Sequence, residues 1–282
     1  MWCCANPCIY AYQIGQLGQF QPFSNIPMTK SILLGRPKGV PAMRAFERPS
    51  FRAYARLTGA LYLLIAFAGG FSILFVPSAL NVPGDPAATF ANIARQRALF
   101  NAGLVGDVVM MTAEVLVSVM LYFMFRPVNA TLSLAASYAR LMMVAVMAAM
   151  LFFHAASLAL ADGTMSLNSF SEAQRIELAG LMRHIHDAGV WIWQIFFCLH
   201  LLLLGVLVMR SGFYPRFIGA GLIVGGTGYL LDSVQMFAFP EATTLETVKI
   251  ALLLIVTLAE IGFALWLLIR GPRKSTSAAL AA

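Results

Sequence analysis

The sequence predicts an all-α, polytopic integral membrane bundle of six transmembrane helices, and three observations lead to that prediction. Of the 282 residues, 60% are hydrophobic and only 11% are charged, whereas a soluble domain has about 25% charged residues. The apolar residues gather into runs of about 20 or more, which is enough for a helix to cross a hydrocarbon core of about 30 Å. Basic residues flank the whole set of runs, as membrane insertion favours.

Six apolar runs define the expected helices. They span residues 57–80, 98–125, 141–161 (with a start as early as 131), 187–209, 214–239 and 247–269. Proline, glycine or both stand just after the first, second, fourth, fifth and sixth runs, and these residues end helices.

Two segments between the runs have the pattern of short surface helices. Asp85 is a favourable N-cap followed by proline at the first helical position, and it leads into 87–97. Ser171 and Gln174 form a capping-box pattern that predicts a helix up to about residue 186. This second helix either covers the mouth of the bundle or is a plain connector.

The net charge of +7 is distributed as in a membrane protein rather than a nucleic-acid-binding protein. An even number of spans puts both termini on one side. With both in the cytosol, 14 Lys and Arg residues lie inside and five outside. The opposite placement reverses that ratio, so we expect an N-in/C-in topology and no nucleic-acid partner.

Residues 1–42 differ from the rest of the chain, because they are rich in Gln, Pro and Gly and contain no run long enough to insert. We expect 1–42 to be a disordered tail or a start-site artefact, with Met43 as the natural start. A basic cytosolic lead-in over 43–56 precedes the six-helix domain at 57–270, and 271–282 form a cytosolic tail. The four cysteines include no CxxC pair, so a zinc ribbon or a thioredoxin-type site is not indicated.

Ionisable side chains inside the runs are the best indication of function, because a charge at the bilayer centre costs roughly 3 kcal/mol unless it is paired, hydrated or functional. Glu114, His200 and Glu260 fall roughly 20–24 Å below the outer face, at 1.5 Å per residue. Arg140 enters the third helix from inside. It either forms a structural ion pair with Glu114 or, if that helix begins at residue 141, extends to the headgroups.

A second polar layer is expected nearer the outer face. Asp107 lies seven residues before the deep glutamate of the same helix, so the two share a helix face. Asp232 is expected at a comparable depth in the fifth run. His154, His186 and Asp187 are candidate metal ligands, since imidazoles and carboxylates bind zinc, although their spacing matches no known motif.

The fifth run carries Gly221 and Gly225 in a GxxxG pattern, which lets two helices approach closely in lipid. The pattern predicts packing within the chain, with a possible homodimer as the alternative. No GxSxG elbow and no P-loop occur in the sequence, so neither serine-hydrolase chemistry nor ATP-driven chemistry is indicated.

Several short stretches together resemble one membrane-protein family. They are RLTGALYLL at 56–64, VPGD at 82–85, RPVN at 126–129, LHLLLLG at 199–205, RSGFYPR at 210–216 and GYLLDS at 228–233. Over about 52–270 the chain resembles the bacterial family called domain of unknown function 4386. The resemblance implies a multi-pass protein of the bacterial cytoplasmic (inner) membrane with no assigned activity, and it transfers no catalytic residue.

The leading hypothesis is a membrane protein that handles a small molecule or an ion through a buried polar core. One alternative is a metal-dependent intramembrane enzyme that acts on a membrane-borne substrate. Another is a structural or assembly protein whose buried charges fix helix packing. The sequence identifies neither a cofactor nor a catalytic residue, and it leans away from an enzyme.

Overall fold

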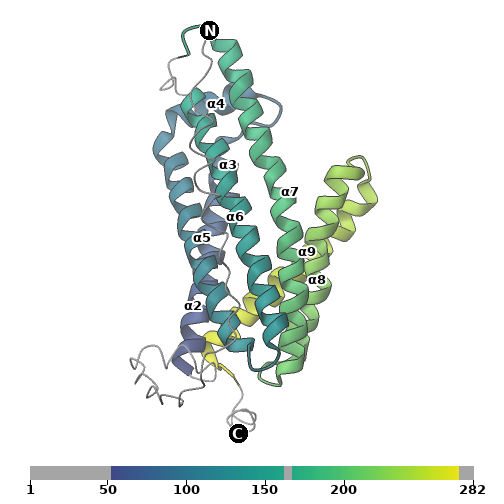
Figure 1. Ribbon diagram of the computed structural model, residues 1–282. Coiled ribbons are helices and arrows are strands. Elements are labelled where there is room, and N and C mark those ends of the chain that lie inside the picture. The colour runs from purple at the N-terminus through teal and green to yellow at the C-terminus, as the bar shows by residue number, and fades with distance from the viewer. Residues whose placement is uncertain (1–51, 162–166, 273–282) are drawn as a thin grey trace, which may run out of the picture. The chain divides into compact units, whose positions relative to one another are not determined.

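The structure, a computed structural model, describes residues 52–161 and 167–272. The expected tail at 1–42 and nearly all of the tail at 271–282 lie outside these residues. The helices in chain order are α2 (Arg52–Gly69), the π-helical η1 (Gly70–Phe75), α3 (Val76–Leu80), α4 (Pro86–Arg95), α5 (Arg97–Phe125), α6 (Ala130–Ala161), α7 (Glu172–Ser211), α8 (Arg216–Ala238) and α9 (Thr243–Ile269) (Figure 1).

The all-α membrane class is confirmed. Since α2, η1 and α3 follow one another without a break, six helical segments are long and apolar enough to cross a membrane, one for each predicted run. No strand occurs in the described ranges. The chain therefore forms a six-helix, membrane-type bundle.

Helix α7 is longer than predicted. Its 40 residues extend over about 60 Å at 1.5 Å per residue, and they join the expected surface helix and the fourth span into one helix. The capping box at Ser171 and Gln174 is present as predicted. A separate surface helix was the wrong prediction, because no proline stands between residues 172 and 209 and the glycines in that range are tolerated inside a helix.

Helix α6 begins at Ala130, the earlier of the two starts that the sequence allowed. The side chain of Asn129 accepts a hydrogen bond from the backbone N–H of Leu132 at 2.9 Å, which satisfies one free donor of the first turn. Arg140 therefore lies well inside the helix rather than at its end.

The six spans form a closed ring, in which α2 contacts α5 and α9, α5 contacts α6, α6 contacts α7, and α8 lies between α7 and α9. Glycines allow the closest approaches. A Cβ at Gly59 would lie 2.6 Å from the carbonyl oxygen of Ala264, and one at Gly225 only 2.3 Å from the backbone nitrogen of Val256. These contacts hold α9 against α2 and α8.

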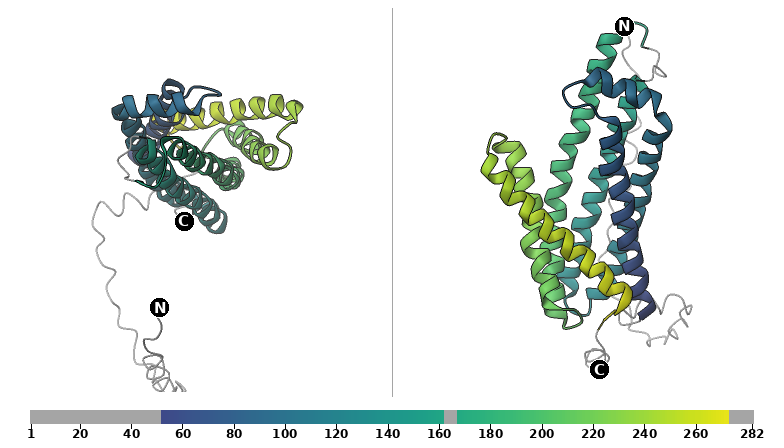
Figure 2. Two further views of the ribbon diagram at one scale, coloured as in Figure 1. Left: turned by 90° about the horizontal axis from the view of Figure 1, so that it is seen from above. Right: turned by 180° about the vertical axis from the view of Figure 1, so that it is seen from behind.

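We call the end of the bundle where α2 begins and α9 ends the proximal end, and the opposite end, where α3 ends and α7 begins, the distal end (Figure 2). Toward the distal end α8 and α9 lean away from α7 (Figures 1 and 2). Asp85 caps α4 as predicted, since its Oδ1 accepts from the N–H of Ala88 at 2.9 Å. Helix α4 then packs on α6 and α7 and buries Phe90 and Ile93.

Candidate functional site

A fully buried arginine joins four helices near the middle of the bundle. Arg140 of α6 is 0% exposed, and its Nε donates to Oε2 of Glu114 on α5 in an ion pair. Its Nη1 donates to the hydroxyl of Tyr62 on α2 at 2.8 Å and lies 2.9 Å from Nε2 of His200 on α7. We call these four residues the Arg140 cluster.

The hydrogen bonds of the cluster define the state of His200. Its Nδ1 lies 2.8 Å from the carbonyl oxygen of Ala136, which can only accept, so Nδ1 carries a hydrogen. Its Nε2 faces the guanidinium of Arg140, which can only donate, so Nε2 accepts. A neutral imidazole therefore satisfies both neighbours, and the charge of Arg140 is balanced by Glu114. Of the two roles expected for Arg140, this geometry favours a structural ion pair with Glu114 over an extension to the headgroups.

Aromatic rings enclose the arginine further. The guanidinium carbon lies 4.8 Å from the ring centroid of Tyr62 and 5.8 Å from that of Phe197, within the range of cation–π attraction. Glu260 of α9 is half-buried and lies within electrostatic range of Arg140 and Glu114. Among the described residues it forms no hydrogen bond or ion pair with them, so it stands beside the cluster rather than in it.

A cavity of about 270 Å³ lies at the distal end, between η1, α3, α5, α6 and α7. We call it the distal pocket. Its ionisable lining residues are Asp107, His154, Arg183, His186 and Asp187. The remaining lining is mostly apolar, with methionine, isoleucine, leucine, phenylalanine and tryptophan side chains. The π-helical turn of η1 contributes Ser72 and Ile73, and such turns are frequent at functional sites.

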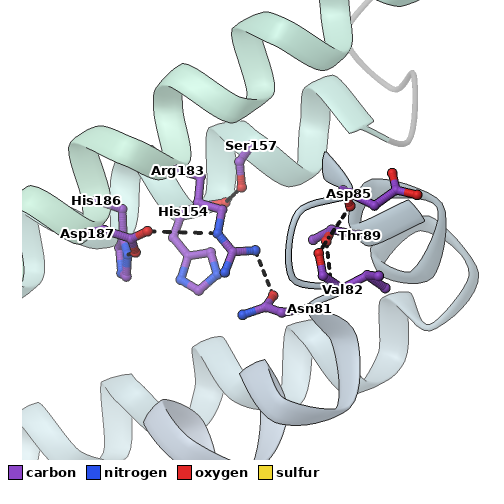
Figure 3. Close-up of polar contacts among 9 residues, drawn as sticks. All are labelled: Asn81, Val82, Asp85, Thr89, His154, Ser157, Arg183, His186 and Asp187. Atoms are coloured by element: carbon purple, nitrogen blue, oxygen red, sulfur yellow. Dashed lines mark hydrogen bonds and ion pairs between the residues drawn. The ribbon is translucent and has the colours of Figure 1, made fainter. Parts of the chain in front are cut away.

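The mouth of the distal pocket carries a polar network (Figure 3). Nη1 of Arg183 donates to Oδ1 of Asn81 at 2.7 Å, and its Nε lies 3.9 Å from Oδ2 of Asp187. Nδ1 of His186 lies 3.2 Å from Oδ1 of Asp187. The side chains of Arg183 and Asp187 are 31% and 51% exposed, which identifies this network as the entrance.

His154 lies behind the entrance with an unused ring nitrogen. Its ring centroid is 4.4 Å from that of His186 and 4.7 Å from that of Phe100. Within the described part of the chain, its Nδ1 is buried and has no hydrogen-bond partner. Buried polar atoms in folded proteins nearly always have a partner. This nitrogen is therefore available to a molecule inside the pocket.

The register of three helices sets the distance between the Arg140 cluster and the distal pocket. Asp107, Met147 and Trp193 line the pocket, and each stands seven residues from a member of the cluster on its own helix. Seven residues correspond to about 10.5 Å of helix. These three residues lie about two helical turns from the cluster, whereas Met111, which also lines the pocket, stands only three residues before Glu114 on α5.

The structure separates some candidates that the sequence had grouped. Asp107 lines the distal pocket, but Asp232 does not: its Oδ1 accepts from Nζ of Lys249 at 3.0 Å, on the α8–α9 side of the bundle. Nζ of Lys249 also lies 2.7 Å from Oε2 of Glu246. The structure therefore does not bring Asp107 and Asp232 into one pocket, because Asp232 faces α9 while the neighbouring Ser233 donates to the carbonyl oxygen of Trp191 on α7 at 2.7 Å.

The three candidate metal ligands, His154, His186 and Asp187, all line the distal pocket. Over 52–161 and 167–272, however, no group of three or more His, Cys, Asp or Glu side chains is arranged to hold a metal ion. Coordination by these three residues stays a prediction.

Sequence reasoning missed four residues that make direct contacts here. Arg183, four residues before Asp187 on one helix, was identifiable as an i, i+4 partner. Lys249 had a similar signal, three residues after Glu246. Tyr62 and Asn81 gave none, because their contacts join segments 78 and 102 residues apart.

The ring of six spans, the buried ion pair and the distal pocket together define a multi-pass membrane protein of the helical class. The chain belongs to the family described as "Domain of unknown function (DUF4386)", which matches residues 57–271. It is also similar to a protein of Archaeoglobus fulgidus described as "Uncharacterized protein", with 29% identity over 172 residues, 61% of this chain and 85% of the relative. This relative is archaeal, so the bacterial origin expected from the resemblance stays a prediction. No solved structure matches the chain.

Proposed function

We propose that this protein lies in the cytoplasmic membrane and binds a small molecule in the distal pocket, as a step in transporting or sensing that molecule. The observation that carries the proposal is the cavity itself: about 270 Å³ with ionisable groups along a mostly apolar wall. Known ligand pockets have this composition, with volumes of roughly 300–1,000 Å³. A cavity at the lower end of that range suits a molecule with one ring or a short chain.

The charge distribution supports an N-in/C-in orientation, since 13 of the 19 Lys and Arg residues then lie on the cytosolic side and five on the outer side, with Arg140 buried between them. In that orientation the proximal end faces the cytosol and the distal pocket opens on the outer side. A ligand would then enter past Arg183 and Asp187.

The Arg140 cluster has a supporting role in this proposal. It is buried and internally hydrogen-bonded, so it offers little to a ligand, yet it fixes α2, α5, α6 and α7 at one level. Three of those helices form walls of the distal pocket. The cluster therefore keeps the deep end of the pocket in a constant geometry.

Gly221 and Gly225 face α9 of the same chain, because a Cβ at either position would meet Ala259 or Val256 at 2.9 Å or less. This contact supports the intramolecular role of the GxxxG pattern. A homodimer through the same two residues stays a prediction.

Thermal unfolding of the protein in lipid nanodiscs tests the binding proposal. The probes are benzylamine, benzyl alcohol and benzoate, which share one ring and differ in charge. A ligand that binds the folded state raises the unfolding temperature, because it stabilises that state by RT ln(1 + L/Kd), where L is the free ligand concentration.

The matched variants are Val190→Phe, which adds a ring to the pocket wall, and Val224→Phe, which adds the same ring to an exposed site on α8. We expect at least one probe to stabilise the wild type and the Val224→Phe variant but not the Val190→Phe variant. Equal shifts in all three proteins, or no shift in any, would contradict a binding function of the distal pocket.

A further inference from the structure

We infer that the ligand of the distal pocket is a small organic cation, whose protonated amine pairs with Asp107 while its apolar part fills the pocket. This inference rests on the proposed function, because it names the chemical class of the molecule that the pocket takes. It follows from the balance of charges along the wall, from the position of Asp107 and from the side chains around it.

The pocket wall has an excess of negative charge. Two carboxylates, Asp107 and Asp187, and one guanidinium, Arg183, line the pocket, so with neutral histidines its formal charge is −1. The guanidinium is already engaged by Oδ1 of Asn81 at 2.7 Å and by the carboxylate of Asp187 at 3.9 Å. Within the described ranges Asp107 has no cationic partner, since the Ser72 hydroxyl that donates a hydrogen bond to it is neutral.

Asp107 lies at the deep end of the pocket, where compensation by water is weakest. It is half-buried in the middle of α5, seven residues below Phe100 at the distal side. No basic side chain forms an ion pair with it in the described ranges. Unpaired carboxylates at such depth are expensive in a membrane, and a cationic ligand would supply the missing partner.

The surroundings of Asp107 suit an organic cation better than a metal ion or an anion. Trp193, Phe100 and Met111 line the same cavity. Aromatic faces attract ammonium groups, and the methionine thioether is polarisable and adaptable. An anion would have to enter against both carboxylates of the wall.

The unused nitrogen of His154 offers a second polar contact nearer the mouth. Because Phe100 contacts the His154 ring and precedes Asp107 by seven residues, the two polar points are separated by about 10 Å along the helix axis. A ligand with an amine at its inner end and a hydrogen-bonding group at its outer end would contact both Asp107 and His154.

The three probes of the thermal-unfolding experiment separate this inference from the proposed function. We expect benzylamine to bind the wild type more tightly than benzyl alcohol, and benzyl alcohol more tightly than benzoate. Asp107→Asn should weaken benzylamine about tenfold or more, the loss expected when a charged hydrogen bond is removed, with benzyl alcohol little changed. Glu177→Gln, at an exposed carboxylate of α7, is the matched control.

The outcomes differ for the two proposals. If a probe binds in a way that Val190→Phe prevents, but benzylamine is not preferred or Asp107→Asn leaves its affinity unchanged, the cation inference is overturned and the binding function stands. If no probe shows binding that Val190→Phe prevents, both are overturned. The ranking of the three probes uses only the wild type, so it decides the question even if Asp107→Asn fails to fold.

Discussion

Replacing Glu114 by glutamine removes the negative charge opposite Arg140 and leaves the shape of the side chain nearly unchanged. The amide oxygen can still accept from Nε of Arg140, but the buried guanidinium then has neutral partners in Tyr62 and His200. Within the described residues Glu260 is near the guanidinium but forms no hydrogen bond or ion pair with it. Removing one partner of a buried ion pair typically costs about 3–5 kcal/mol. We predict a loss of unfolding free energy in that range for Glu114→Gln.

Two further variants of the same cluster bracket this value. Tyr62→Phe removes the neutral hydroxyl that accepts from Nη1 of Arg140, and it should lower the free energy of unfolding by about 1.5–3 kcal/mol. The double variant Glu114→Gln with Arg140→Met removes both charges, so it should be less destabilising than the sum of the two single changes, with a coupling of about 2 kcal/mol or more.

Reversible unfolding in mixed detergent micelles, followed by far-ultraviolet circular dichroism, measures these free energies. A change below about 1 kcal/mol for Glu114→Gln, or additive effects in the double variant, would refute the view that a balanced buried ion pair holds the four helices together.

Three other predictions concern packing, a second ion pair and topology. Gly225→Ala should destabilise the protein, because a Cβ there would lie 2.3 Å from a backbone nitrogen of α9. Gly262→Ala, which has open space around it, should be neutral or should stabilise the protein by up to about 1 kcal/mol. Chemical unfolding of both variants checks these two expectations. Lys249→Met should lower stability by about 2 kcal/mol, since it leaves two carboxylates facing each other without their shared cation; a thermal stability equal to the wild type would contradict it. In a cysteine-free background, Glu177→Cys should react with an impermeant maleimide added to intact cells and Val128→Cys should not; the reverse pattern would contradict the N-in/C-in orientation.

The number of spans was predictable because helix length in a membrane is fixed by the thickness of the hydrocarbon core. The caps at Asp85 and Ser171 were predictable because they depend on residues within one turn. The length of α7 was not, since no local pattern near residues 186 and 187 shows whether two neighbouring helical segments join into one helix.

The depth of each ionisable residue along the bundle was easier to predict than the neighbouring helix that its side chain faces. Glu114 and Arg140 do meet, and His154 and His186 do lie together, because a rise of 1.5 Å per residue places each at a known level. Asp232 was expected beside Asp107 for the same reason. It lies elsewhere because its side chain faces Lys249 on α9, while the neighbouring Ser233 faces α7 and donates to the carbonyl oxygen of Trp191; no local pattern in the sequence shows which way each side chain points.

The hydrogen-bond partners within the polar groups were the least predictable part. Tyr62 reaches Arg140 across the bundle, and Asn81 reaches Arg183 at the mouth of the pocket. Both depend on side chains from separate helices pointing to the same place. The unused nitrogen of His154 became visible for the same reason, since a missing partner can be recognised only when all neighbours are known.

Photolabelling tests most directly whether the distal pocket holds a small molecule. The protein in nanodiscs is labelled with a diazirine derivative of benzylamine, and the label is mapped by peptide mass spectrometry. We expect label on pocket residues of α5, α6 and α7, such as Met111, Met147 or Trp193. We also expect this labelling to disappear when unlabelled benzylamine is in excess. Label spread over lipid-facing side chains such as Phe217 or Leu258, unaffected by competition, would contradict it.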